Sequence, residues 1–131
     1  MSSVMLTLLV LKTARLEELC YFYHAVGMEL STEQHGSGPR HYSVRLGELV
    51  LELYPLPSGA AAERSDLRLG FAVGDLHATL LRLRRIGTDV RSQPTDTEWG
   101  LRAVVSDPDG RSVELYQTEG QRRRRGSDPA P

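Results

Sequence analysis

A short pattern near the middle of the chain recurs near its end. Residues 51–54 read LELY, and residues 113–116, about 60 positions later, read VELY. A glycine that ends a helix-like stretch recurs at a similar offset, as Gly27 and Gly87. Because repeated units bury their apolar faces against each other, the repeat predicts two copies of one module, with the working surface at the seam between them.

The composition is that of one ordinary globular domain. The chain has 131 residues, of which 40% are hydrophobic and 25% charged, enough for a substantial core. A formal net charge of −1 provides no general attraction to nucleic acid or to an anionic membrane. The apolar run at residues 4–11 is too short for a membrane span and lacks the flanks of a signal peptide. We therefore expect a cytoplasmic protein without a nucleic-acid or membrane partner.

The first half of the chain has the pattern of a β-α-β-β-β unit. Apolar residues are nearly continuous in its first segment, and they recur at helical spacing in the second, which ends at Gly27. Turn-forming residues separate the segments that follow. The predicted elements are a strand at residues 6–11, a helix at 15–25, and strands at 28–33, 40–46 and 49–54.

The second half repeats this order after a proline- and alanine-rich linker at residues 55–64. Asp75 is a predicted helix cap, and Asp107, Pro108, Asp109 and Gly110 form a hairpin turn rather than a metal motif. The predicted elements are a strand at 67–73, a helix from Asp75 to its stop at Gly87, and strands at 88–91, 101–105 and 112–117. We expect one domain over residues 1–120, with modules at about 4–55 and 66–118, and a disordered basic tail at 121–131.

Over about residues 4–118 the chain resembles the vicinal oxygen chelate superfamily of glyoxalase I, bleomycin-resistance proteins, fosfomycin-resistance enzymes and extradiol dioxygenases. The residues that carry the resemblance are Phe22, Tyr23 and Gly27, residues 51–53 and 71–76, and the Asp107–Gly110 turn leading to Glu114. The resemblance implies an α+β fold in which two tandem β-α-β-β-β modules form a curved, incomplete barrel around a cavity, with the helices outside. It also implies a homodimer.

Metal-dependent members of this superfamily hold an ion with one histidine and one glutamate from each module. The resemblance places the two glutamates at Glu52 and Glu114, and the two histidines at Leu8 and Arg68. Leucine has no lone pair to donate, and a protonated arginine repels a divalent cation. The usual metal site is therefore broken at two of its four positions. No cofactor is expected, although a divalent metal bound by His41, Glu52 and Glu114 stays open.

Strand alternation indicates which side chains surround this broken site. If Glu52 and Glu114 face the cavity, the residues two positions away on the same strands face it as well, and neighbouring strands add histidine and arginine side chains. Such a concave surface of mixed polarity is typical of a small-molecule pocket. The candidate catalytic residues are His41, Glu52 and Glu114, and the candidate ligand-binding residues are Arg45, Tyr54, Arg68, Trp99 and Tyr116.

Each of these residues also has a plainer interpretation. His41 could act with Glu52 as a general acid or base, or could be a hydrogen-bonded wall residue, which a lone histidine favours. Arg68 could bind a ligand carboxylate or phosphate, or could form a structural ion pair with a glutamate. Trp99 could stack on an aromatic ligand or simply pack at the rim.

Three functions are compatible with these residues. The first is a protein that binds a small organic molecule in its cavity without the usual metal, either sequestering the molecule or processing it. The second is a metal-dependent lyase, isomerase or dioxygenase with a His41, Glu52 and Glu114 site. The third is an interaction module whose pocket is filled by its own side chains. The retained carboxylates disfavour the third, and the lost histidines favour the first over the second. Whether the protein is an enzyme, and whether its modules pair within one chain or across a dimer, stay open.

Overall fold

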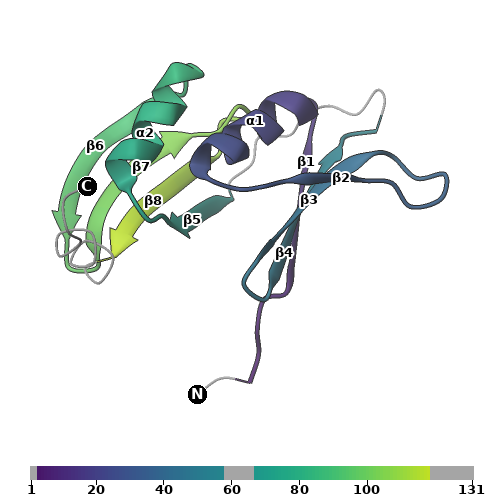
Figure 1. Ribbon diagram of the computed structural model, residues 1–131, viewed down its shortest axis with the longest axis horizontal. Coiled ribbons are helices and arrows are strands. Elements are labelled where there is room, and N and C mark those ends of the chain that lie inside the picture. Colours follow the sequence, from purple (N-terminus) through teal and green to yellow (C-terminus); the bar gives the residue numbers. More distant parts are fainter. Residues whose placement is uncertain (1–2, 58–66, 119–131) are drawn as a thin grey trace, which may run out of the picture.

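The computed structural model describes residues 3–57 and 67–118 (Figure 1). Most of the expected linker and all of the expected basic tail lie outside these residues. The elements follow the predicted order twice. They are β1 (Leu8–Thr13), α1 (Leu16–Val26), β2 (Ser31–Glu33), β3 (His41–Leu46), β4 (Leu49–Pro55), β5 (Arg68–Ala72), α2 (Leu76–Arg85), β6 (Val90–Thr97), β7 (Gly100–Ser106) and β8 (Ser112–Thr118).

Each module forms its own four-stranded mixed sheet, so the predicted pair of β-α-β-β-β modules is confirmed. The strand orders are β1-β4-β3-β2 and β5-β8-β7-β6. In each sheet the first strand runs parallel to the last, and the other neighbours are antiparallel. Figure 1 shows two curved sheets, with α1 packed against the first sheet and α2 against the second. Within the described residues the sheets do not close into a barrel.

The internal repeat is visible in the strand register. Leu8 pairs with Val50 in the first sheet, and Arg68 pairs with Ser112 in the second. Leu8 and Arg68 therefore occupy equivalent positions on the first strands of the two modules. Each also lies two residues before the partner of a repeated glutamate, because Val10 pairs with Glu52 and Gly70 pairs with Glu114.

The helix boundaries follow from local chemistry. Gly27 ends α1 with a φ of +126°, a conformation that side-chain-bearing residues rarely adopt, and its N–H donates to the carbonyls of Tyr23 and His24. Asp75 begins α2 by accepting a hydrogen bond from the backbone N–H of Ala78, as predicted. The helices pack against each other and against the sheets (Figure 1). The largest fully buried apolar side chains are Tyr23, Phe22, Leu19, Leu51, Leu53, Leu76, Leu80, Leu83, Leu115, Val105 and Val113.

The boundaries of several strands differ from the prediction. The strand expected at residues 88–91 is wrong in extent, because β6 continues to Thr97 through Pro94. Proline lacks the N–H that a central strand needs, but β6 is an edge strand and its pairing with β7 shifts register between Ser92 and Thr95. β1 starts at Leu8 rather than residue 6 and extends through polar residues to Thr13, because it pairs with β4 along its whole length. β2 has only its last three predicted residues.

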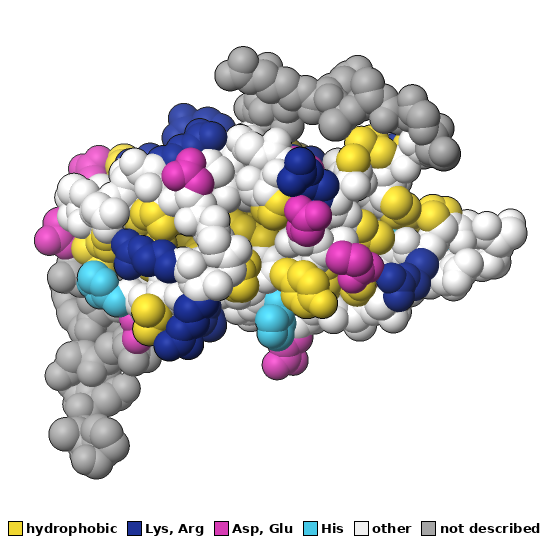
Figure 2. Space-filling view, turned by 90° about the horizontal axis from the view of Figure 1, so that it is seen from above, with side chains coloured by type: hydrophobic (Ala, Val, Ile, Leu, Met, Phe, Trp, Pro, Cys, Tyr) yellow, Lys and Arg dark blue, Asp and Glu magenta, His cyan; other side chains and the backbone are white. Residues whose placement is uncertain are grey.

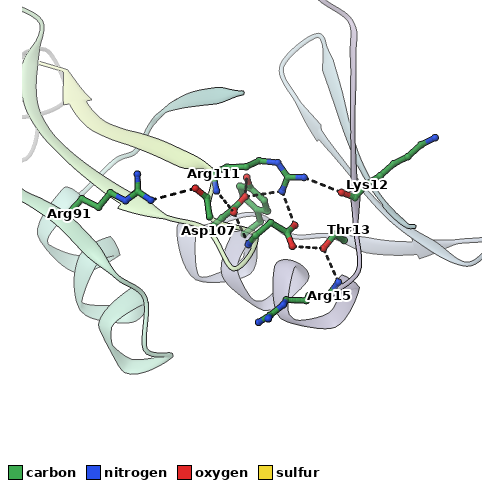
Figure 3. A network of polar contacts seen from close by, with 9 residues as sticks. Lys12, Thr13, Arg15, Arg91, Asp107 and Arg111 are labelled. Atoms are coloured by element: carbon green, nitrogen blue, oxygen red, sulfur yellow. Dashed lines mark hydrogen bonds and ion pairs between the residues drawn. The ribbon is translucent and has the colours of Figure 1, made fainter. Parts of the chain in front are cut away.

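A buried polar network joins the two modules at the turn before β8 (Figure 3). Arg111 donates to Asp107 at 3.1 Å and to Asp109 at 2.9 Å, and it also donates to the backbone carbonyl of Lys12 at 3.0 Å. Asp109 in turn accepts from the hydroxyl of Thr13 at 3.0 Å. The two aspartates thus serve the turn and an arginine, in agreement with the prediction that they form a hairpin rather than a metal motif.

No helix in the described part of the chain is long and apolar enough to cross a membrane. Figure 2 shows basic and acidic side chains interspersed with apolar ones on the face seen from above. This face therefore has no patch of a single charge that would attract a polyanion.

Candidate functional site

The repeated glutamates lie on the sheet faces that point away from the core. Leu51 and Leu53 are fully buried, whereas Glu52 between them is only partly buried. The same alternation holds in β8, where Glu114 lies between two fully buried residues. A strand that packs one face against helices leaves its alternate side chains on the other face, as the sequence pattern predicted.

In the first module, His41 and Glu52 lie together, and two further residues join them. The His41 side chain is 1% exposed, and its Nε2 atom lies 3.3 Å from Glu52 Oε2 and 3.5 Å from Glu33 Oε2. Glu33 Oε2 is also 3.3 Å from Nε2 of His35, in the loop that joins β2 to β3. Neither Glu33 nor His35 was among the predicted site residues. The feature that associates Glu33 with this cluster is its position directly across from His41 in the pairing of β2 with β3.

The ring of His41 is held from two directions. Its Nδ1 atom lies 3.2 Å from the carbonyl oxygen of Pro39, and a carbonyl can only accept, so Nδ1 carries the proton. The ring of Tyr54 stacks on the imidazole with centroids 4.1 Å apart and planes 11° apart. Tyr54 thus contacts His41 in the structure, and its contact with a ligand stays a prediction. In the neutral ring Nε2 therefore carries a lone pair, which is the form in which histidine accepts a proton or binds a metal.

In the second module, Glu114 is paired with two arginines. Arg68 donates to Glu114, as the ion-pair interpretation predicted, and Arg102 donates to the same oxygen at 2.8 Å. The hydrogen bond from Arg102 is the largest cause that lowers the pKa of Glu114, and the charges of both arginines add to the effect. Arg102 was not among the predicted residues. The sequence feature that could have identified Arg102 is the alternation of β7, where Leu101 and Ala103 are buried and the residue between them lies on the opposite face.

Replacing Arg102 by alanine is expected to raise the pKa of Glu114 toward that of an ordinary glutamate, because the hydrogen bond that contributes most to lowering this pKa is lost while Arg68 remains. Carboxyl ¹³C chemical shifts followed through a pH titration measure this change. Arg84→Ala is the matched control, since Arg84 donates to Gln93 rather than to a carboxylate. An unchanged titration of Glu114 in the Arg102→Ala variant would contradict the assignment.

Each glutamate lines a separate hollow. The hollow beside Glu114 has a volume of about 420 Å³ and contains Trp99, whose side chain is 73% exposed. The hollow beside Glu52 has a volume of about 480 Å³ and contains Leu8 and Arg45. That the two glutamates share one cavity stays a prediction. The first hollow is lined by Thr97, Trp99, Arg102, Glu114 and Tyr116, and the second by Thr7, Leu8, Glu29, Ser31, Glu33, Ser43, Val44, Arg45, Val50 and Glu52.

The four positions of the superfamily's usual metal site do not fit a metal in this chain. Leu8 presents only carbon atoms, and it is 52% exposed. Arg68 places a permanent cation on Glu114, so that carboxylate is already neutralised. Of that set of four, only Glu52 remains as a donor that no arginine of the described residues neutralises, and one carboxylate does not make a transition-metal site.

Comparison with known proteins agrees with this architecture. The model of the Glyoxalase/Bleomycin resistance protein/Dioxygenase superfamily matches residues 6–115. The chain resembles the solved structure of TnmS3, an antibiotic binding protein from Streptomyces sp. CB03234, with 27% identity and a TM-score of 0.67; the match covers 91% of this chain and 99% of that one.

Two other solved structures have similar folds. A glyoxalase/bleomycin resistance protein, also from Streptomyces sp. CB03234, is 30% identical with a TM-score of 0.65, over 86% of this chain and 100% of that one. TioX from Micromonospora sp. ML1 shares the fold at 16% identity and a TM-score of 0.67, over 88% and 99% of the two chains. No curated protein matches the chain at a significant level. Since the family model spans most of the chain and the two sheets have the expected topology, this protein belongs to the Glyoxalase/Bleomycin resistance protein/Dioxygenase superfamily.

Proposed function

We propose that the protein binds a small organic molecule on the concave faces of its sheets, without the metal site usual in its superfamily. The observation that carries this proposal is the pairing of Glu114 with Arg68 and Arg102. The two guanidinium groups neutralise the Glu114 carboxylate, which would otherwise be available to bind a metal. The same arrangement leaves donors of both arginines available to a ligand, because both side chains are substantially exposed.

The chemistry of the hollow beside Glu114 indicates the class of ligand. Trp99 and Tyr116 offer aromatic surface, and Arg102 offers planar hydrogen-bond donors at the same place. A planar aromatic molecule that carries a carboxylate, phenolate or carbonyl oxygen matches both features. The similarity to an antibiotic binding protein at 27% identity supports an antibiotic as the ligand, and the hollow itself favours one with an aromatic ring. Binding of this kind sequesters the small molecule. The expected location of the protein is the cytoplasm.

The functional unit in this proposal is a homodimer. Leu8 and Val10 on the edge strand β1 are exposed, and so are Met5 and Leu6 just before it. Exposed apolar side chains that gather along one strand are typical of a protein interface. A second copy that covers this strand would also bring another sheet against Glu52, so the complete pocket would contain residues of two chains.

The alternative, a metal-dependent lyase, isomerase or dioxygenase, requires Glu114 to join His41 and Glu52. In the structure His41 contacts Glu52, but Glu114 contacts Arg68 and Arg102 instead. We therefore favour binding over metal-dependent turnover.

Trp99 is the single tryptophan of the chain, so its fluorescence reports on this hollow alone. Titration with anthraquinone-2-carboxylate, a planar aromatic anion, is expected to quench the fluorescence in a saturable way. Calorimetric titration of Trp99→Ala should show binding at least about tenfold weaker, because loss of the aromatic contact that Trp99 would make with the bound probe costs on the order of 1.4 kcal/mol or more.

Tyr21→Ala is the matched control, since Tyr21 is an exposed aromatic residue on α1 that lines a different hollow. This variant should bind the probe as the unmodified protein does. Absence of quenching across a panel of planar aromatic antibiotics, or equal weakening by Tyr21→Ala, would refute the proposed function.

A further inference from the structure

The cluster of side chains around His41 is not explained by the proposed binding function. We infer that Glu33, His35 and His41 form a binding site for a divalent transition-metal ion of the Zn²⁺ type, with Glu52 as the adjoining carboxylate. This site lies entirely within the first module. It differs from the superfamily's usual set, because Leu8, Arg68 and Glu114 take no part in it.

The first observation is the spacing of the donor atoms. One ligand atom from each of Glu33, His35 and His41 lies within 4.8 Å of the other two. The closest approaches to Glu33 Oε2 are 3.3 Å from His35 Nε2 and 3.5 Å from His41 Nε2. Two atoms bound to Zn²⁺ at about 2.0–2.1 Å in tetrahedral geometry lie about 3.3–3.4 Å apart. Glu33 is therefore spaced from each of the two histidines as two ligands of one ion would be.

The second observation is the unsatisfied nitrogen of His41. This side chain is 1% exposed, and its Nε2 atom makes no hydrogen bond although two carboxylate oxygens lie at 3.3 and 3.5 Å. A buried nitrogen without a hydrogen-bond partner is costly, and a neutral imidazole would point its lone pair at the lone pairs of both carboxylates. A cation between these atoms removes the repulsion and satisfies the nitrogen.

The third observation is the support behind His41. Metal-binding histidines usually donate their second ring N–H to a carbonyl or carboxylate, which fixes the tautomer and the ring orientation. His41 has this arrangement, with Nδ1 at 3.2 Å from the Pro39 carbonyl and Tyr54 stacked on the ring. The direct pairing of Glu33 with His41 across β2 and β3 adds a rigid backbone under both ligands.

The donor set determines the kind of ion. Imidazole nitrogens with carboxylate oxygens suit Zn²⁺, Co²⁺ and Ni²⁺, whereas Mg²⁺ and Ca²⁺ prefer oxygen ligands throughout. An ion at this place would tie the loop between β2 and β3 to the sheet through His35, which is otherwise 75% exposed. The ion would thus order one wall of the hollow that contains Glu33 and Glu52.

Calorimetric titration of the full chain with Zn²⁺, after treatment with a chelator, tests the inference. One ion per chain is expected to bind. Loss of an outer-shell partner weakens metal binding by roughly 10–100-fold. His35→Ala and Glu33→Gln should each weaken Zn²⁺ binding by more than this, because each removes a direct ligand of the ion. His35 is exposed and Glu33→Gln keeps the side-chain shape, so both variants should fold, which far-ultraviolet circular dichroism verifies.

The other histidines of the chain provide matched controls. His24 interacts with the carbonyl of Met28, and His77 lies on α2, so His24→Ala and His77→Ala should bind Zn²⁺ with unchanged affinity. Cys20→Ser should also leave binding unchanged, since burial raises the pKa of the Cys20 thiol and disfavours the thiolate that binds metals. Co²⁺ gives a second readout, because its visible absorption should be intense if the ion is four-coordinate and should weaken in His35→Ala.

No stoichiometric Zn²⁺ binding by the full chain would overturn the inference. So would binding that persists at full affinity in His35→Ala and Glu33→Gln, or that falls equally in His77→Ala. These outcomes are independent of the proposed function, which is tested by an aromatic probe at Trp99 in the other module.

Discussion

Replacing Asp107 by alanine is expected to destabilise the protein by about 3–5 kcal/mol, because it removes one of the two carboxylates that pair with a buried arginine, together with the hydrogen bonds that Asp107 accepts. The Asp107 side chain is completely buried and that of Arg111 is 7% exposed. Asp107 also accepts from the backbone N–H groups of Asp109 and Arg111, so the same change removes two hydrogen bonds that shape the turn. The substitution thus combines loss of a buried ion pair with loss of hydrogen bonds in the turn.

The buried hydroxyl of Tyr23 adds to this dependence. It donates to Asp107 at 3.5 Å, and burial, followed by the charge of Asp107, raises its pKa far above the ordinary value. Tyr23 therefore stays protonated at any ordinary pH and remains a donor. Without Asp107, the hydroxyl loses this acceptor in the core, which costs a further penalty of desolvation.

Urea unfolding measures the loss as a lower midpoint. Arg91→Ala is the matched control, because Arg91 is an exposed arginine that reaches the same turn only through a 3.5 Å contact with the Gly110 carbonyl, and it should change stability little. The double variant Asp107→Ala with Arg111→Met should recover part of the loss, since it removes a buried positive charge that has lost one of its two carboxylate partners. Equal midpoints for Asp107→Ala and the unmodified protein would show that the network does not hold the modules together.

Replacing Gly100 by alanine is expected to have the next largest effect. Gly100 begins β7 with a φ of +130°, and a Cβ atom there would overlap the backbone carbonyl oxygen of Gln117 on β8. Both the conformation and the overlap are unfavourable, and the conformation alone costs on the order of 1–3 kcal/mol. Because the overlapping atom belongs to a paired strand, it cannot move without disturbing the sheet.

Thermal unfolding of Gly100→Ala against Gly74→Ala tests this expectation. Gly74 has an ordinary φ and an added Cβ would meet no atom within 4 Å, so the control should unfold near the temperature of the unmodified protein. Gly100 also follows Trp99 directly, so the variant should weaken quenching by the aromatic probe. A midpoint for Gly100→Ala equal to that of the control would contradict the tight β7–β8 approach.

Much of the fold could be predicted because its signals are local. The alternation around Glu52 placed Leu51 and Leu53 in the core, and both are fully buried. Asp75 was predicted as a helix cap, and its side chain accepts the expected hydrogen bond. The resemblance to the superfamily assigned Leu8 and Arg68 to corresponding positions of the two modules, and the strand registers place them equivalently. Periodicity and capping depend on residues within a few positions, so the sequence contains them in full.

The candidate sites could be predicted only in part. His41 and Glu52 lie on adjacent predicted strands and do contact each other, and Arg68 pairs with Glu114. Arg102 and Glu33 were missed, because their roles depend on which residue faces them across the sheet. That pairing is fixed by the register between β2 and β3 and between β7 and β8, which does not follow from propensity.

The sequence by itself determined the two-module order, the core faces of the strands and the loss of two histidines from the superfamily's metal positions. Only the tertiary structure decided that His41 lies against Glu33 as well as Glu52, that two arginines neutralise Glu114, and that Arg111 reaches back to Lys12. The physical reason is the distance along the chain over which each effect acts. Burial patterns arise from neighbours along the chain, whereas the charge and hydrogen bonding of a side chain depend on groups that folding brings from distant segments.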